Sequence, residues 1–145
     1  MAGTASRFAG VPKRYFLDFV AYLILFIFAV ARAPRDLGLA VGVGVAAPSF
    51  ALWLLARWQL GRSFTLAPEA RELVTHGLYA RIRHPVYIFS TLVLIGTAIC
   101  LRNLFFDGYV AAVIVLQVFR TRREDAVLSQ QFGARYDEYR RRTWL

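Results

Sequence analysis

Four apolar blocks separated by basic segments constrain this chain more than any other feature of its sequence. They occupy residues 15–31, 37–58, 85–101 and 104–119. Each is long enough, or nearly so, for one helix to cross the ~30 Å hydrocarbon core of a bilayer. Charged residues make up 19% of the chain, whereas soluble domains carry about 25%. The sequence therefore predicts a single all-α, multi-pass integral membrane domain over residues 1–145, with four transmembrane helices and a cytoplasmic amphipathic C-terminal helix.

The first block is open to two interpretations. Ala29-Val30-Ala31 has the small-x-small pattern of a signal-peptide cleavage site. Asp18, however, interrupts the apolar run. We therefore expect a retained helix, with Asp18 at the membrane interface beside Lys13 or Arg14.

The second block carries small residues in its first half and tryptophans near its end. Gly38 and Gly42 have the small-xxx-small spacing that lets two membrane helices approach closely. Trp53 and Trp58 are placed where aromatic side chains mark the membrane interface. Cys100 is the only cysteine. It lies in an apolar run, so we expect it to serve packing, without a disulfide or a metal.

The last two blocks predict a tight antiparallel helical hairpin, because only Arg102 and Asn103 separate them. From Arg120 onward the chain is polar and helix-forming, and Gly133 is expected to end one helix and begin a short second one. The apolar residues of this polar region are spaced as an amphipathic strip: Val127, Leu128, Phe132, Tyr136 and Tyr139.

Basic residues predict the orientation in the membrane. With four spans, fifteen of the 18 Lys and Arg lie in the N-terminal tail, the loop between the second and third blocks, and the C-terminal segment. Only three lie on the opposite side, so both termini should be cytoplasmic. The net charge of +9 raises nucleic acid as a partner, but anionic lipid headgroups are the simpler counter-surface for charges that flank apolar blocks. Lys13 is the only lysine, and this preference for Arg suggests a GC-rich bacterial genome and hence the inner membrane.

The loop before the third block places polar side chains at the start of a membrane helix. Pro85 suits the first helical position, where a missing N–H costs nothing. It should push His84 into an extended conformation and hold the imidazole at the helix mouth. The free N–H groups of Val86 and Tyr87 can then receive an anion such as a carboxylate. The alternative is that Arg81, Arg83 and His84 only flank the membrane. Tyr79 and Tyr87 would then belong to an interfacial belt of aromatic residues.

A second group of polar residues follows the fourth block. Arg120 and Glu124 are four residues apart, so on a helix both side chains share a face. They form either an ordinary surface ion pair or a site in which Glu124 meets a bound cation, because a carboxylate beside buried helix ends is costly without a cationic partner.

Together these segments resemble the isoprenylcysteine carboxyl methyltransferase family and the related membrane phospholipid N-methyltransferases. The resemblance covers residues 71–142, whereas the first two helices are only generically hydrophobic. It rests on Leu73-Val74-Thr75-x-Gly77-x-Tyr79, on Arg83-His84-Pro85-x-Tyr87, and on Arg120 with Glu124-Asp125, Leu128, Phe132-Gly133, Tyr136 and Tyr139.

The resemblance implies an S-adenosylmethionine-dependent methyltransferase. By the family pattern, the cofactor site is lined by Arg71, Glu72, Leu73, Val74, Tyr79, His84, Pro85, Val86, Tyr87 and Glu124. Arg120 would bind the substrate and, with Glu124, act in catalysis. The family usually has two Glu where this chain has Glu124-Asp125, so the role of Asp125 is left open. Methyl transfer needs alignment more than a strong acid or base, and no metal is expected.

The acceptor and the enzyme class leave alternatives. A lipophilic acceptor would enter from the bilayer, as a prenylated-cysteine carboxylate, a phospholipid amine or a small thiol. An NADPH-dependent membrane reductase of related architecture is a second hypothesis, although no basic set dedicated to a 2′-phosphate is evident. A non-catalytic membrane subunit is a third, in which the Gly/Ala-rich second helix would form an interface.

Overall fold

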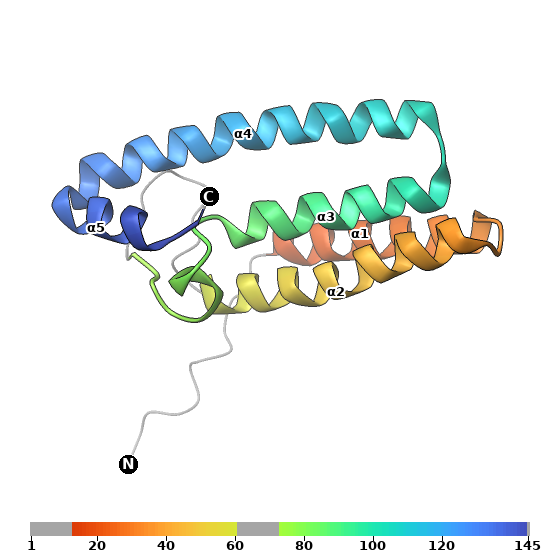
Figure 1. The fold of residues 1–145 in the computed structure, drawn as a ribbon, viewed down its shortest axis with the longest axis horizontal. Helices are drawn as coiled ribbons and strands as arrows, with labels where there is room; N and C mark the ends of the chain where they lie inside the picture. The colour runs from red at the N-terminus through yellow and green to blue at the C-terminus, as the bar shows by residue number, and fades with distance from the viewer. Residues whose placement is uncertain (1–12, 61–72, 145) are drawn as a thin grey trace, which may run out of the picture.

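The computed structural model describes residues 13–60 and 73–144, without the side chains of residues 13–16 and 18. The described residues form five α-helices and one 3-10 helix (Figure 1). These are α1 (Lys13–Arg32), α2 (Leu37–Leu60), η2 (Gly77–Ala80), α3 (Pro85–Leu101), α4 (Leu104–Phe132) and α5 (Ala134–Arg142). Arg71 and Glu72 lie outside the described residues, and the prediction for Asp18 concerns a side chain that is not described.

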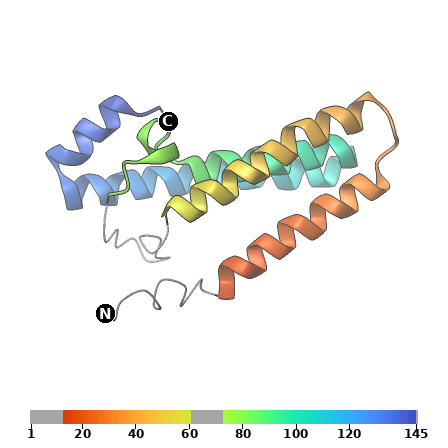
Figure 2. The ribbon, with the colours of Figure 1, turned by 90° about the horizontal axis from the view of Figure 1, so that it is seen from below.

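Helices α1 to α4 run lengthwise beside one another, and α5 and η2 lie together at one end (Figures 1 and 2). We call this the α5 end, and the opposite end, with residues 33–36 and 102–103, the turn end. Helices α2 and α4 are long and apolar enough to cross a membrane, while Phe19–Arg32 and Pro85–Leu101 are shorter apolar helices. The apolar block 104–119 continues into the polar segment as one helix of 29 residues. Gly133, at φ 52°, then separates α4 from α5, at the predicted position.

The turn end is held by two side chains of the hairpin. Arg102 takes a left-handed conformation, with φ 48° and ψ 47°, and its N–H donates to the Ala98 carbonyl. Asn103 caps α4 by accepting from the N–H groups of Phe105 and Phe106. The Arg102 guanidinium also lies 2.7 Å from the Asp36 carboxylate. The two turns at this end are therefore joined to each other.

Close backbone contact joins α2 to α3. A Cβ atom on Gly42 would lie 2.7 Å from the Gly96 carbonyl oxygen, and one on Gly96 would lie 2.6 Å from the Gly42 carbonyl oxygen. Only glycine permits this approach, as the Gly-rich second block predicted. Cys100 is buried beside the same contact.

The core at the α5 end joins α2, η2 and α3. Its buried members are Trp53, Ala56, Tyr79, Val86 and Phe89. The interfacial interpretation of Trp53 is wrong: its side chain is only 2% exposed, because it packs between α1, α2 and α3, whereas Trp58 is 79% exposed. The core thus holds the segment before α3 against the end of α2.

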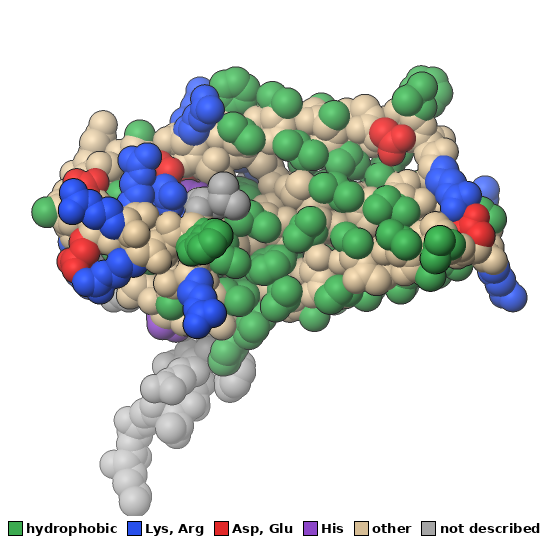
Figure 3. Space-filling view, viewed as in Figure 1, with side chains coloured by type: hydrophobic (Ala, Val, Ile, Leu, Met, Phe, Trp, Pro, Cys, Tyr) green, Lys and Arg blue, Asp and Glu red, His purple; other side chains and the backbone are tan. Residues whose placement is uncertain are grey.

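The surface separates apolar from charged side chains. On the face shown in Figure 3, hydrophobic side chains cover the middle of the bundle, and charged side chains gather mostly toward its two ends. Large exposed hydrophobic residues include Ile24, Ile27, Leu116 and Phe119, on α1 and α4. This distribution suits a bundle surrounded by lipid.

Candidate functional site

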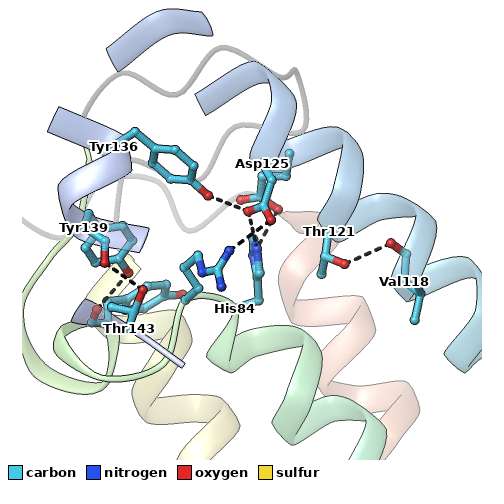
Figure 4. Close-up of polar contacts among 10 residues, drawn as sticks. His84, Val118, Thr121, Asp125, Tyr136, Tyr139 and Thr143 are labelled. Carbon is cyan, nitrogen blue, oxygen red and sulfur yellow. Dashed lines mark hydrogen bonds and ion pairs between the residues drawn. The ribbon is translucent and has the colours of Figure 1, made fainter. Parts of the chain in front are cut away.

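The start of α3 and the polar part of α4 meet at the α5 end (Figure 4). His84, directly before α3, is buried, and its Nε2 lies 2.8 Å from Oδ1 of Asp125. Its other ring nitrogen, Nδ1, lies 3.9 Å from Oε2 of Glu124. One imidazole therefore lies between two neighbouring carboxylates of α4.

Asp125 is the most highly connected residue of this group. Besides His84, it accepts hydrogen bonds from Arg83 Nη1 at 3.2 Å and from the Tyr136 hydroxyl at 2.5 Å. Burial by itself would raise the pKa of Asp125, but the Tyr136 and His84 hydrogen bonds and the nearby basic groups outweigh it, so the pKa is lowered. Asp125 is therefore a firmly ionised anchor.

Glu124 has a different environment although it is the adjacent residue. Its side chain is half-buried, and burial raises its pKa, opposed by the charge of His84 and by a hydrogen bond from the Tyr87 hydroxyl. Arg120 is exposed, and within the described part of the chain no ion pair joins it to Glu124. The arrangement thus differs from an ordinary Arg120–Glu124 surface pair.

The N-terminus of α3 begins as predicted at Pro85, but His84 is not extended. Its φ is −123° and its ψ is 56°. Pro85 excludes the helical region for His84, while the His84 carbonyl still accepts from the Ile88 N–H at 3.2 Å, which turns ψ away from the extended value. The His84 side chain makes no capping hydrogen bond to the first-turn N–H groups.

Most of the remaining predicted residues lie near the start of α3 and are at least partly buried. Tyr79, Pro85 and Val86 are buried, and Leu73 and Val74 are half-buried, with Val74 packed against the core. The structure therefore brings Tyr79, His84, Pro85, Val86, Tyr87 and Glu124 to one end of the bundle. Arg120 lies one helical turn before Glu124 on α4.

The C-terminal segment contributes residues whose site role the sequence reasoning missed. The Tyr139 hydroxyl donates to the Tyr79 carbonyl at 2.8 Å, and burial raises the pKa of Tyr139 to about 12, so this donor stays protonated near neutral pH. The backbone N–H of Trp144 donates to the Arg81 carbonyl, and the Trp144 carbonyl accepts from the backbone N–H of Arg83. The sequence signal for the contacts of Tyr136 and Tyr139 is their spacing, because residues three apart share one face of a short helix.

The fold belongs to a known class of membrane proteins. A solved structure described as the eukaryotic intramembrane Ras methyltransferase ICMT, the isoprenylcysteine carboxyl methyltransferase, has a TM-score of 0.64 and 26% sequence identity, covering 94% of this chain and 52% of that chain. This chain therefore shares the fold of that intramembrane methyltransferase. Residues 36–135 match the family model described as phospholipid methyltransferase. The chain belongs to this family and is similar to the isoprenylcysteine carboxyl methyltransferases.

Curated relatives agree with that assignment. A protein-S-isoprenylcysteine O-methyltransferase of Schizosaccharomyces pombe is 29% identical over 133 residues, which are 87% of this chain and 53% of the relative. An Arabidopsis thaliana protein of the same name, form A, is 38% identical over 86 residues, 54% of this chain and 43% of the relative. The chain spans about half the length of the curated relatives it matches.

Proposed function

We propose that this chain is an S-adenosylmethionine-dependent methyltransferase acting on a lipophilic acceptor. The observation that carries the proposal is the meeting of His84 and Tyr87 with Glu124 at the α5 end. Family membership supports the reaction class. The acceptor comes from the bilayer, and the cofactor comes from the aqueous side.

The residues present suit the amino-acid part of the cofactor. The first-turn N–H groups of α3, which the His84 side chain leaves uncapped, are suited to a carboxylate. The half-buried carboxylate of Glu124 is suited to a cationic ammonium or sulfonium group. Leu73, Val74, Tyr79, Pro85 and Val86 supply the wall, and the family pattern adds Arg71 and Glu72. When bound, S-adenosylmethionine supplies a methyl group on a sulfonium centre.

The chain's own contribution is orientation. Asp125 and Tyr136 hold His84, and His84 and Tyr87 in turn hold Glu124. Arg120, exposed one turn away, binds the carboxylate or phosphate of the acceptor and keeps its nucleophile close to the methyl group. Alignment of this kind can lower the barrier without a strong acid or base.

The membrane placement is also proposed. Helices α1, α2 and α3 and residues 104–119 of α4 form four spans, with the α5 end and both termini in the cytoplasm of a bacterium. The charge balance supports this orientation, and the apolar middle of the bundle supports the spans (Figure 3).

Labelled S-adenosylmethionine tests the proposal directly. The purified chain in lipid should bind it, and Glu124→Ala and His84→Ala should each abolish binding. Glu138→Ala is the matched control, because Glu138 is exposed on α5 and pairs only locally with Arg142. Unchanged binding in both site variants, or thermal stabilisation by NADPH in place of S-adenosylmethionine, would contradict the proposal. Transfer of label to a prenylcysteine carboxylate, a phospholipid amine or an alkyl thiol identifies the acceptor.

A further inference from the structure

A polar cluster joins α3 to α4 within their apolar stretches. Gln117 of α4 faces Ser90 and Thr91 of α3: its Oε1 lies 2.6 Å from Thr91 Oγ1, and its Nε2 lies 3.2 Å from Ser90 Oγ. Ser90 is only 6% exposed. Three polar side chains between two apolar helices thus contact one another, which is the arrangement that stabilises polar groups there.

The same cluster reaches the backbone of Tyr87. The hydroxyls of Ser90 and Thr91 lie 3.0 and 2.9 Å from the Tyr87 carbonyl oxygen. The Tyr87 side chain also lies near the Glu124 carboxylate. Gln117 and Glu124 are seven residues apart on α4, about two helical turns, so they share one face. Helix α4 therefore meets α3 at two levels near Tyr87, through Gln117 at one level and Glu124 at the other, and Arg120 lies between them along α4.

Helix α3 packs more extensively against α2 than against α4. Toward the turn end an open groove lies between α3 and α4, lined by Ile95, Ile99, Val110 and Ile114 among others. Other buried hydroxyls bond within their own helix: Thr97 donates to the Val93 carbonyl. The hydrogen bonds of Gln117 with Ser90 and Thr91 thus connect α3 to α4 next to the site.

We propose that Gln117 is a positioning residue that sets the depth and distance of Arg120 relative to the start of α3. This inference rests on the proposed function. In this inference Gln117 aligns the acceptor. The contacts of His84 with Asp125 and Glu124 instead maintain the cofactor-binding part of the site. Removing the amide should therefore reduce turnover much more than cofactor binding.

The kinetic test compares Gln117→Leu with Ser90→Ala/Thr91→Val and with the control Thr97→Val. Both site changes should lower kcat about tenfold or more, because a small misplacement near the reacting groups is costly, and leave the Kd for S-adenosylmethionine within about twofold. Combining the Gln117 and Ser90/Thr91 changes should lower kcat little further, since both remove the same hydrogen bonds. Thr97→Val should match the unmodified protein.

A distance measurement keeps the test independent of catalysis. Nitroxide labels at Ile88 of α3 and Val115 of α4, in a Cys100→Ser background, report the helix spacing. The distance distribution should shift or broaden in Gln117→Leu and in the Ser90/Thr91 variant, but not in Thr97→Val. If either Gln117→Leu or the Ser90/Thr91 variant fails to fold, the distance distribution of the other variant tests the inference.

The possible outcomes distinguish failure of the proposed function from failure of the positioning role of Gln117. If the unmodified chain transfers no methyl group to any acceptor, the proposed function fails, and the positioning role fails with it whatever the distances show. If the unmodified chain is active but Gln117→Leu has a normal kcat or additive effects with the Ser90/Thr91 change, the inference alone is overturned. A loss of cofactor binding equal to the loss in kcat also overturns it.

Discussion

Asp125 and Glu124 are adjacent carboxylates with opposite environments. Asp125 accepts from His84, Arg83 and Tyr136, which lowers its pKa despite burial, whereas burial raises the pKa of Glu124. The His84 ring is thereby held with Nε2 on Asp125 and with Nδ1 toward Glu124. Neighbouring acids whose pKa values move apart commonly have separate roles. Here Asp125 orients His84 and leaves Glu124 available to a ligand.

Tyr136→Phe tests the anchoring of Asp125. Removing a hydrogen bond to a charged group should cost about 1.5–3 kcal/mol of unfolding free energy at pH 7. The Tyr136 bond lowers the folded-state pKa of Asp125, so its stabilisation is present above the ordinary Asp pKa of about 3.9 and is lost as the pH falls through the lowered value. Thermal unfolding in detergent at pH 7 and pH 3 measures this, with the exposed Tyr109→Phe as control. An equal loss at both pH values would contradict it.

The raised pKa of Glu124 predicts pH-dependent cofactor binding. Only the carboxylate form attracts a cation, so affinity should fall as the pH drops through a value above the ordinary Glu pKa of about 4.3. Equilibrium binding of S-adenosylmethionine between pH 8 and pH 5 measures the effect. Glu124→Gln should bind weakly and lose this part of the slope. An unchanged slope in Glu124→Gln would contradict the assignment of this effect to Glu124.

At the scale of elements, the position of α3 depends on two different surfaces. Its contact with α2 is a close backbone approach at Gly42 and Gly96, which tolerates no side chain. Its contact with α4 is sparser and polar, at Gln117 and at His84 with Asp125. Helix α3 is therefore held rigidly on one side and oriented by hydrogen bonds on the other.

Gly96→Ala should destabilise the bundle by about 1–3 kcal/mol, because the added Cβ meets backbone atoms of α2 that cannot rotate away. Gly44→Ala on α2 is the matched control. A Cβ there meets nothing within 4 Å, so the change should be neutral or stabilising by up to about 1 kcal/mol. Thermal unfolding of both variants in the same detergent compares them. Equal behaviour would mean that the helices are free to separate.

At the scale of the whole molecule, charge and apolar surface are arranged along one axis. The α5 end carries α5, whose last turn is entirely basic, together with the site. The turn end carries few basic residues, and Arg102 there is paired with Asp36. An asymmetry of this kind orients membrane proteins during insertion, and it supports the proposed cytoplasmic position of the site.

Cysteine accessibility tests that orientation. In a Cys100→Ser background, Arg141→Cys at the α5 end should be protected from a membrane-impermeant thiol reagent in intact cells, and Arg35→Cys at the turn end should react. Both should react after the membrane is permeabilised, which is the control for exposure. The reverse pattern in intact cells would overturn the proposed orientation.

Some features followed from local sequence because their physical causes are local. The apolar blocks, the two-residue turn at Arg102 and Asn103, the start of α3 at Pro85 and the break at Gly133 all depend on neighbouring residues. Sequence motifs also indicated the family, and the comparisons confirmed it. By contrast, the interfacial position that the sequence predicts for Trp53 is wrong, since nothing nearby in sequence shows that α1 and α3 bury it.

The apolar all-helical character of the chain and the set of polar residues available to a site follow from the amino-acid sequence alone. Helix formation, charge and motif spacing are short-range properties, so they could be read directly. The tertiary structure decided which of two adjacent acids takes His84, and it joined Tyr136, Tyr139 and Trp144 of the C-terminal segment to the start of α3. It also paired Gln117 with Ser90 and Thr91. These choices depend on the rotation and spacing of helices that are distant in sequence, and these become fixed only when α2, α3, α4 and α5 pack together.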